Sequence, residues 1–251
     1  MGSRDGAGSH DGAGPGMNGP AVRSPGSGDA LPLLAVIDMQ RVFGEPGSAW
    51  LAPRFAELIG PVRRLVDAFQ PRVTFTRFLA PAVPAGAWRK YYDQWPFALQ
   101  PADARIYELV DEFAGQPGQT LDTATFSKWS PELAALTSGP GGDPGQLVLA
   151  GVSTDCCVLS TALAAADAGV AVTVVADACA GVTDESHRQA LDILRLYSPL
   201  VEVVSVADIV DKAARSAAAS GESASGESSS GARQARPLAA DRAAGPPAAA
   251  R

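Results

Sequence analysis

The sequence predicts an α/β fold: a three-layer, doubly wound, Rossmann-like sandwich in which helices cover both faces of a six-stranded, mainly parallel sheet. Two observations support this prediction. Short apolar runs bounded by turn residues recur along the chain, and stretches with the apolar spacing of helices lie between them. The segment 30–212 that carries this pattern is long enough to bury one core and has the length of a single domain.

The first elements follow from this pattern. Residues 33–37 (LLAVI) are an unbroken apolar run, as in a strand buried on both faces, and Asp38 follows it. Between 53 and 69 apolar residues recur about every 3.6 positions, which predicts a helix that Pro71 closes before a strand at 73–75. Residues 79–105 contain four prolines and break the alternation, so we expect a long insertion without a regular element.

The second half of the chain continues the alternation. The predicted elements are a short strand near 120–123, a strand at 146–150, a helix at about 155–168, a strand at 170–176, a helix at 185–196 and a last strand at 201–206. In the second of these helices, Leu191, Ile193 and Leu194 are expected to face inward. A doubly wound sheet binds ligands beyond the carboxyl ends of its strands, where the winding reverses.

Composition separates this domain from the two ends of the chain. Residues 1–29 and 213–251 are mostly Gly, Ala, Ser and Pro, with too few large apolar residues to offset the entropy of ordering, and are predicted to be disordered tails. The net charge is −7, whereas a nucleic-acid ligand needs a clustered basic face. No apolar stretch approaches the roughly 18 residues of a membrane span, and no secretory signal is recognisable. We therefore expect a cytoplasmic protein with no nucleic-acid or membrane partner.

Cysteine and histidine are both scarce. Three cysteines do not make an even disulfide framework, so the thiols are expected to be reduced. Of the two histidines, His10 lies in the N-terminal tail and leaves His187 alone in the domain, which disfavours a multi-histidine metal site. No metal and no cofactor is expected.

The segment 149–158 (LAGVSTDCCV) is the strongest candidate for chemistry. It predicts a strand that passes through a glycine turn into a helix capped by Thr154 or Asp155, with Cys157 in the first helical turn. Amide dipoles there lower a thiol pKa and supply N–H groups that hold an oxyanion. The alternative is a cysteine that only packs in the core.

Asp38 is the second candidate, because it follows a buried strand directly. If the strands 33–37 and 146–150 are central neighbours, Asp38 and Cys157 converge on one crevice, where a carboxylate can serve as the base. The alternative is a helix cap or a turn residue.

Two motifs carry a resemblance to a known family. IDMQ at 37–40 and GVSTDCCV at 151–158 resemble the isochorismatase-like cysteine hydrolases, which include isochorismatases, nicotinamidases and N-carbamoylsarcosine amidases. The resemblance covers about 33–206. It implies that Cys157 is the nucleophile, that a non-proline cis peptide precedes Ser153, and that the amides of Ser153 and Cys157 form an oxyanion hole. It also implies a homo-oligomer, a dimer or a tetramer.

The third catalytic residue of this family is a lysine before a YSAF-like sequence, and here the chain departs from the pattern. Aligning FSKW (126–129) with that sequence puts Thr123 near the usual lysine position and Lys128 inside the motif. We expect the long side chain of Lys128 to reach the same crevice from the following loop. The alternative is a solvated surface lysine.

The resemblance also bears on metal and substrate. Metal-containing relatives use histidines after the second strand, and this chain has none there, so His187 is expected to cap or decorate a helix rather than act in catalysis. Five aromatic residues of the insertion form a pocket wall or a subunit contact: Trp88, Tyr91, Tyr92, Trp95 and Phe97.

We take Arg77, Trp88, Tyr92 and Trp95 as substrate-pocket candidates. Arg77 and Arg89 are expected either to bind a substrate carboxylate or to form ordinary surface ion pairs. The sequence thus predicts a metal-independent cysteine hydrolase that cleaves an amide, carbamoyl or ureido bond of a small molecule through a Cys157 thioester. The alternatives are vinyl-ether hydrolysis of the isochorismatase type and a non-catalytic binding protein.

Overall fold

A computed structural model describes residues 32–139 and 142–212, and the tails predicted at 1–29 and 213–251 lie outside the described residues. Six strands form one sheet in the order β3-β2-β1-β4-β5-β6, and every neighbouring pair is parallel. The strands are β1 (Leu33–Ile37), β2 (Val73–Phe78), β3 (Gln119–Thr123), β4 (Gln146–Val152), β5 (Ala171–Ala180) and β6 (Val201–Val204). The predicted fold class is confirmed.

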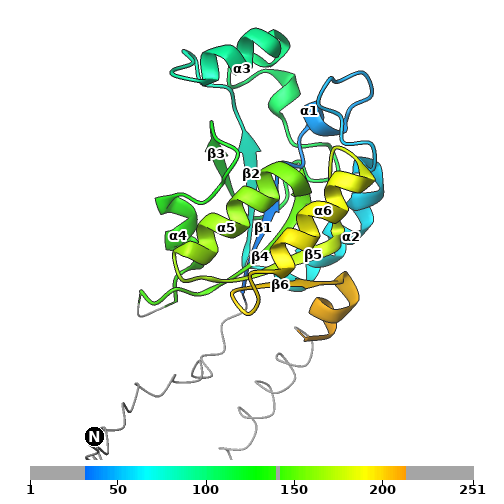
Figure 1. The fold of residues 1–251 in the computed structure, drawn as a ribbon. Helices are drawn as coiled ribbons and strands as arrows, with labels where there is room; N and C mark the ends of the chain where they lie inside the picture. The colour runs from blue at the N-terminus through cyan, green and yellow to red at the C-terminus, as the bar shows by residue number, and fades with distance from the viewer. Residues whose placement is uncertain (1–31, 140–141, 213–251) are drawn as a thin grey trace, which may run out of the picture.

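Helices cover both faces of this sheet (Figure 1). Helix α2 (Phe55–Phe69) and the helical residues 206–212 pack on one face. The other face is covered by α4 (Pro131–Thr137), α5 (Leu159–Asp167) and α6 (Asp184–Arg195). Strand β1 shows why the sheet needs both layers: its residues are all fully buried, and alternate ones pack into opposite cores.

The insertion is more regular than the sequence predicts. It contains helix α3 (Trp88–Gln94) and two 3₁₀ turns, Pro96–Ala98 and Arg105–Tyr107. The expectation of no regular element is wrong because all four prolines lie outside α3, whose seven residues WRKYYDQ are free to form a helix. The short helix α1 (Arg41–Gly44) and α4 were not predicted.

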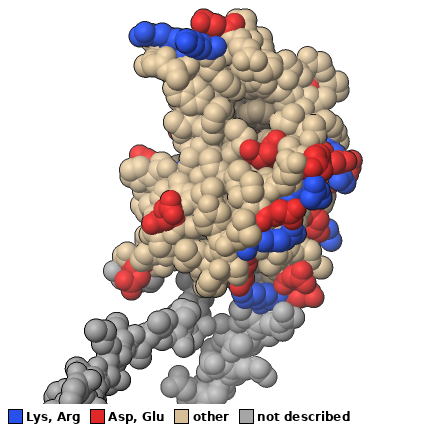
Figure 2. All heavy atoms as spheres, viewed as in Figure 1, with Lys and Arg blue, Asp and Glu red and all other residues tan. Residues whose placement is uncertain are grey.

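Helix α6 corrects one expected core residue. Ile193 is 42% exposed, whereas Leu191 and Leu194 are buried. A helix turns about 100° per residue, so Ile193 does not share the buried side that residues three apart occupy. On the exposed side of α6, Arg188 pairs with Glu185 and Asp192. Figure 2 shows basic and acidic side chains gathered over this part of the surface.

The reversal of winding lies between β1 and β4, which are central neighbours as the sequence analysis required. Their register pairs Ile37 with Gly151. Asp38 follows the first of these residues and Ser153 follows the last residue of β4, so both emerge at the same edge of the sheet. This is the edge where doubly wound folds bind ligands.

Gly151 is expected to be essential for this junction. Its φ is +113°, and a Cβ at this position would lie 2.1 Å from the carbonyl oxygen of Ile37 in the central strand. We expect Gly151→Ala to lower the free energy of unfolding by at least about 3 kcal/mol, because both the backbone conformation and the contact oppose a side chain. Urea titration measures this change. The matched control is Gly60→Ala in α2, where a Cβ meets open space, and it is expected to be neutral or stabilising.

Candidate functional site

Asp38 is buried at the carboxyl end of β1 in a left-handed conformation, with φ +49°. Thr76 of β2 fixes its orientation: the Thr76 hydroxyl donates to Asp38 Oδ1 at 2.8 Å and accepts from the Asp38 amide at 3.2 Å. A non-glycine residue with positive φ is uncommon outside turns and functional sites. Strand β2 therefore holds the carboxylate in one orientation.

Lys128 is the cation that meets this carboxylate. Its Nζ lies 2.9 Å from Asp38 Oδ2, and both side chains are fully buried. Nζ also donates to the Thr123 hydroxyl and to the Thr125 carbonyl, each at 3.1 Å, and lies 5.1 Å from the centre of the Phe78 ring. The alternative of a solvated surface lysine is wrong. The side chain extends back to Thr123, the position where the family lysine was expected.

The two neighbouring cysteines lie at the other side of the site. After β4, a single π-helical turn, Thr154–Val158, precedes α5. The expected helix cap is wrong, because Ser153 occupies the N-cap position and makes no side-chain capping bond. Asp155 instead accepts from the Ser153 hydroxyl and the Val182 amide. The peptide bond between Val152 and Ser153 is cis.

Thr161 of α5 ties the cysteine turn to the lysine loop. Its hydroxyl donates to the Cys157 carbonyl at 2.6 Å and accepts from the Lys128 amide at 2.8 Å. The hydroxyl is buried, so both bonds are costly to break. One side chain thus fixes the relative positions of the cysteine and the lysine.

The two thiols differ in pKa. The interaction with the neighbouring Cys157 thiol lowers the pKa of Cys156. The same interaction raises the pKa of Cys157 well above its ordinary range, and burial raises it further. The expectation that the helix start lowers the pKa of Cys157 is therefore corrected: within the pair, the negative charge resides more readily on the more exposed Cys156.

We expect iodoacetamide to modify Cys156 before Cys157. A thiol reacts as the thiolate, so the lowered pKa of Cys156 moves its half-maximal rate to a pH below that of an ordinary cysteine. Tandem mass spectrometry of peptides alkylated between pH 6 and 10 locates the adduct. Cys179, buried and with its pKa raised to about 12, serves as the internal reference. If Cys157 is modified before Cys156 across this pH range, the assignment of the lower pKa to Cys156 is contradicted.

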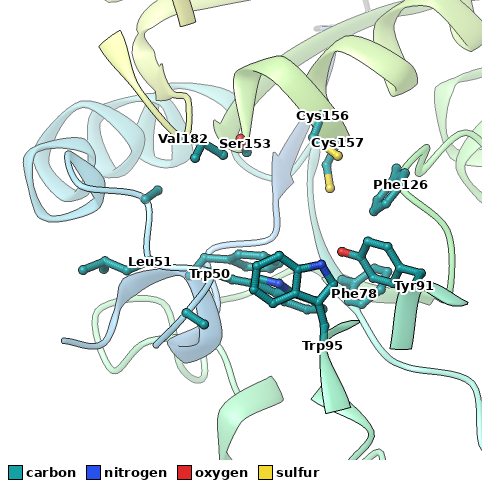
Figure 3. A pocket seen from close by; sticks show the side chains of 13 residues that line it. Trp50, Leu51, Phe78, Tyr91, Trp95, Phe126, Ser153, Cys156, Cys157 and Val182 are labelled. Carbon is teal, nitrogen blue, oxygen red and sulfur yellow. The ribbon is translucent and has the colours of Figure 1, made fainter. Parts of the chain in front are cut away.

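A cavity of about 340 Å³ opens beside these thiols (Figure 3). Both cysteines and Ser153 lie on one side of it, and Trp50, Trp95 and Phe78 lie on the opposite side. The full lining comprises Phe43, Ala49, Trp50, Leu51, Ala52, Phe78, Tyr91, Trp95, Phe126, Ser153, Cys156, Cys157 and Val182.

Only one of the four residues predicted to line the substrate pocket does so in the structure. Trp95 lines the cavity, whereas Trp88 and the buried Tyr92 stand behind its wall and pack against Tyr91. Arg77 is not part of the lining, because it forms two hydrogen bonds with Asp122 on β3, at 2.8 and 2.7 Å. Arg89 is also outside and donates to the Pro84 carbonyl.

His187 also lies outside the cavity. Its Nδ1 is 2.8 Å from the Thr154 hydroxyl, and burial lowers its pKa. Thr183, not His187, caps α6. Within 32–139 and 142–212, no group of three or more His, Cys, Asp or Glu side chains is placed to hold a metal ion. No helix in the same residues is long and apolar enough to cross a membrane.

Comparison with known proteins places this geometry in a family. The model of the isochorismatase domain matches residues 32–208. The chain belongs to the isochorismatase family. This is a family of hydrolases. The resemblance that the motifs IDMQ and GVSTDCCV indicated is confirmed.

Solved structures of the isochorismatase fold resemble this chain throughout the domain. A cysteine hydrolase from Pseudomonas syringae pv. phaseolicola 1448A has a TM-score of 0.66 at 21% identity, over 80% of this chain and 100% of the other. N-carbamoylsarcosine amidase from Thermoplasma acidophilum gives 0.55 at 21%, over 70% and 96%. Nicotinamidase from Bacillus subtilis gives 0.54 at 18%, over 69% and 98%. At these identities the likeness shows the fold. A comparison with curated protein sequences gives no match.

The sequence analysis did not identify several residues of this isochorismatase-family site. Gln40 is buried and bonds to the backbone of Phe78 in both directions and to the Tyr107 carbonyl, which ties the end of β1 to β2 and the insertion. Trp50 and Phe126 line the cavity from separate loops. Gln40 lies inside the IDMQ motif and Phe126 inside FSKW, which were the available signals, whereas no local pattern marks Trp50.

Proposed function

We propose that this protein is a metal-independent cysteine hydrolase that cleaves the C–N bond of a small amide, carbamoyl or ureido compound through a thioester on Cys157. The observation that carries the proposal is the buried Asp38–Lys128 pair at the sheet edge from which the cysteine turn also emerges. Two of the solved relatives, a nicotinamidase and an N-carbamoylsarcosine amidase, are named for amide chemistry.

The first step is attack by the Cys157 sulfur on the carbonyl carbon. Since the pKa of this thiol is raised, few thiolates exist at neutral pH, and a base has to take the proton as the sulfur attacks. Asp38 is the proposed base. Thr76 and Lys128 hold its carboxylate, and the positive charge of Lys128 favours the thiolate.

The second part of the reaction releases the amine. The amides of Ser153 and Cys157 are proposed to stabilise the oxyanion of the tetrahedral intermediate. The C–N bond then breaks, Asp38 returns its proton to the leaving amine, and the acyl group stays on sulfur. Water hydrolyses the thioester, giving the acid and the free thiol. No step passes through a metal, since the described residues offer no cluster of metal-ligand side chains.

Ammonia release from a panel of primary amides, ureido acids and carbamoyl amino acids tests the proposal. We expect turnover of at least one compound, and a covalent acyl adduct on Cys157 in rapidly quenched samples analysed by mass spectrometry. An adduct on Cys156 would overturn the assignment of the nucleophile. No turnover of any compound, together with ordinary thiol reactivity, would support a binding protein on this fold.

A further inference from the structure

The cavity beside the cysteines contains no charged side chain. Of its thirteen lining residues, six are aromatic, and the only side chains among them with polar atoms are Trp50, Tyr91, Trp95, Ser153 and the two cysteines. Its volume of about 340 Å³ is at the lower end of the roughly 300–1,000 Å³ typical of small-molecule sites. This space suits a compound with one ring rather than an extended ligand.

None of the cations near the site in sequence lines the cavity. Arg41, Arg54 and Arg77 form ion pairs with carboxylates outside it, and Lys128 is fully buried against Asp38. Arg89 donates to a backbone carbonyl, and Lys90 is exposed. A carboxylate entering the cavity would lose its hydration without gaining a cationic partner, which disfavours its binding strongly.

The wall opposite the thiols consists of packed rings. Trp50 lies at its centre, with Phe97 at 5.1 Å, Phe43 at 6.0 Å, Tyr91 at 6.0 Å and Trp95 at 6.1 Å between ring centroids. In Figure 3 the sulfur atoms of the cysteines face this wall across the open space, and the Tyr91 hydroxyl points into the same space. Because the rings support one another, the wall is preorganised for a planar group.

We infer that the pocket binds an uncharged, planar, apolar acyl group, and that the substrate is a neutral aromatic or conjugated primary amide rather than an anionic ureido or carbamoyl amino acid. This inference rests on the proposed function for its reaction, but the binding preference follows from the pocket alone. The carbonyl faces the thiols, the ring lies along Trp50 and Trp95, and the Tyr91 hydroxyl is available for one hydrogen bond to the ligand.

Three amides of closely similar shape test the inference in the full-length protein. They are 4-methylbenzamide, which is neutral, 4-carboxybenzamide, which is anionic, and 4-(aminomethyl)benzamide, which is cationic. We expect kcat/KM, measured by ammonia release, to be at least about 100-fold higher for the neutral compound, because a buried charge without a partner is costly. Equal or preferred turnover of either charged amide would overturn the inference.

Binding is measured separately in Cys157→Ala by quenching of tryptophan fluorescence, so that the result does not depend on catalysis. We expect 4-methylbenzamide to bind at least 10-fold more tightly than the charged amides, and Trp95→Ala in the same background to weaken it. Tighter binding of the neutral amide without turnover by the wild-type protein would contradict the proposed function and support the pocket assignment. Turnover confined to anionic ureido acids would support the proposed function and overturn the pocket assignment. If none of the three amides binds, the inference is also overturned.

Arg77→Gln is the matched control for a carboxylate site. Arg77 lies outside the cavity and is bound by Asp122, so the variant is expected to leave the kcat/KM of all three amides within twofold. A tenfold loss confined to 4-carboxybenzamide would show that Arg77 receives the ligand carboxylate, and would overturn the inference.

Discussion

Cys157→Ala is expected to lower the kcat of amide hydrolysis by at least about 10³-fold, because the variant has no sulfur to form the acyl intermediate. Cys156→Ala leaves the Cys157 sulfur in place and removes only the neighbouring thiol that raises its pKa. It is expected to retain turnover, with a loss of no more than about tenfold. Steady-state ammonia release and mass spectrometry of trapped adducts measure both variants.

The Cys157→Ala and Cys156→Ala variants also distinguish thioester chemistry from vinyl-ether cleavage. Vinyl-ether cleavage of the isochorismatase type needs no attacking thiol. Retained turnover in Cys157→Ala would therefore favour that reaction over thioester chemistry. Loss of activity in Cys156→Ala with retention in Cys157→Ala would instead move the nucleophile to the neighbouring residue.

Lys128→Met is expected to lower the free energy of unfolding by about 3–5 kcal/mol, because it leaves the Asp38 carboxylate buried without its cation. It also removes the donor to the Thr123 hydroxyl and the Thr125 carbonyl. Activity is expected to fall by at least about 10²-fold, since the charge that favours the thiolate is lost. Urea titration at fixed protein concentration and kcat measurements test the two effects.

A double variant separates the charge from the packing at this site. Asp38→Asn combined with Lys128→Met removes both charges, and we expect it to be more stable than Lys128→Met alone while remaining inactive. The exposed Lys90→Met provides the surface control and is expected to change stability by less than about 0.5 kcal/mol. A loss of stability in Lys128→Met no larger than in Lys90→Met would contradict the buried ion pair.

The alternative of a non-catalytic binding protein was motivated by the displaced lysine. The structure removes this motivation, because Lys128 reaches the Asp38 carboxylate from its shifted position, with Nζ also bonded to Thr123. A different position in the sequence thus supplies an ammonium group to the same sheet edge.

The elements predicted most accurately are those that local patterns determine. The run LLAVI is buried at every residue because it lies in the centre of the sheet, and the periodicity of 53–69 corresponds to the buried side of α2. The strand boundaries were less accurate. Strand β5 extends to Ala180, beyond the predicted end at 176, because it pairs with β4 past an irregularity in register that the sequence does not reveal.

By itself, the sequence determined the fold class, the order of the six strands with helices α2, α5 and α6, and the positions of Asp38 and Cys157 just beyond two central strands. It did so because apolar periodicity and turn residues are local properties of the chain. Only the tertiary structure decided that Lys128 is buried against Asp38, that the pKa values of the two neighbouring thiols shift in opposite directions, and that Trp50 and Phe126 line the cavity while Arg77 does not. These facts depend on which side chains from distant segments meet, and on the charges and burial that result.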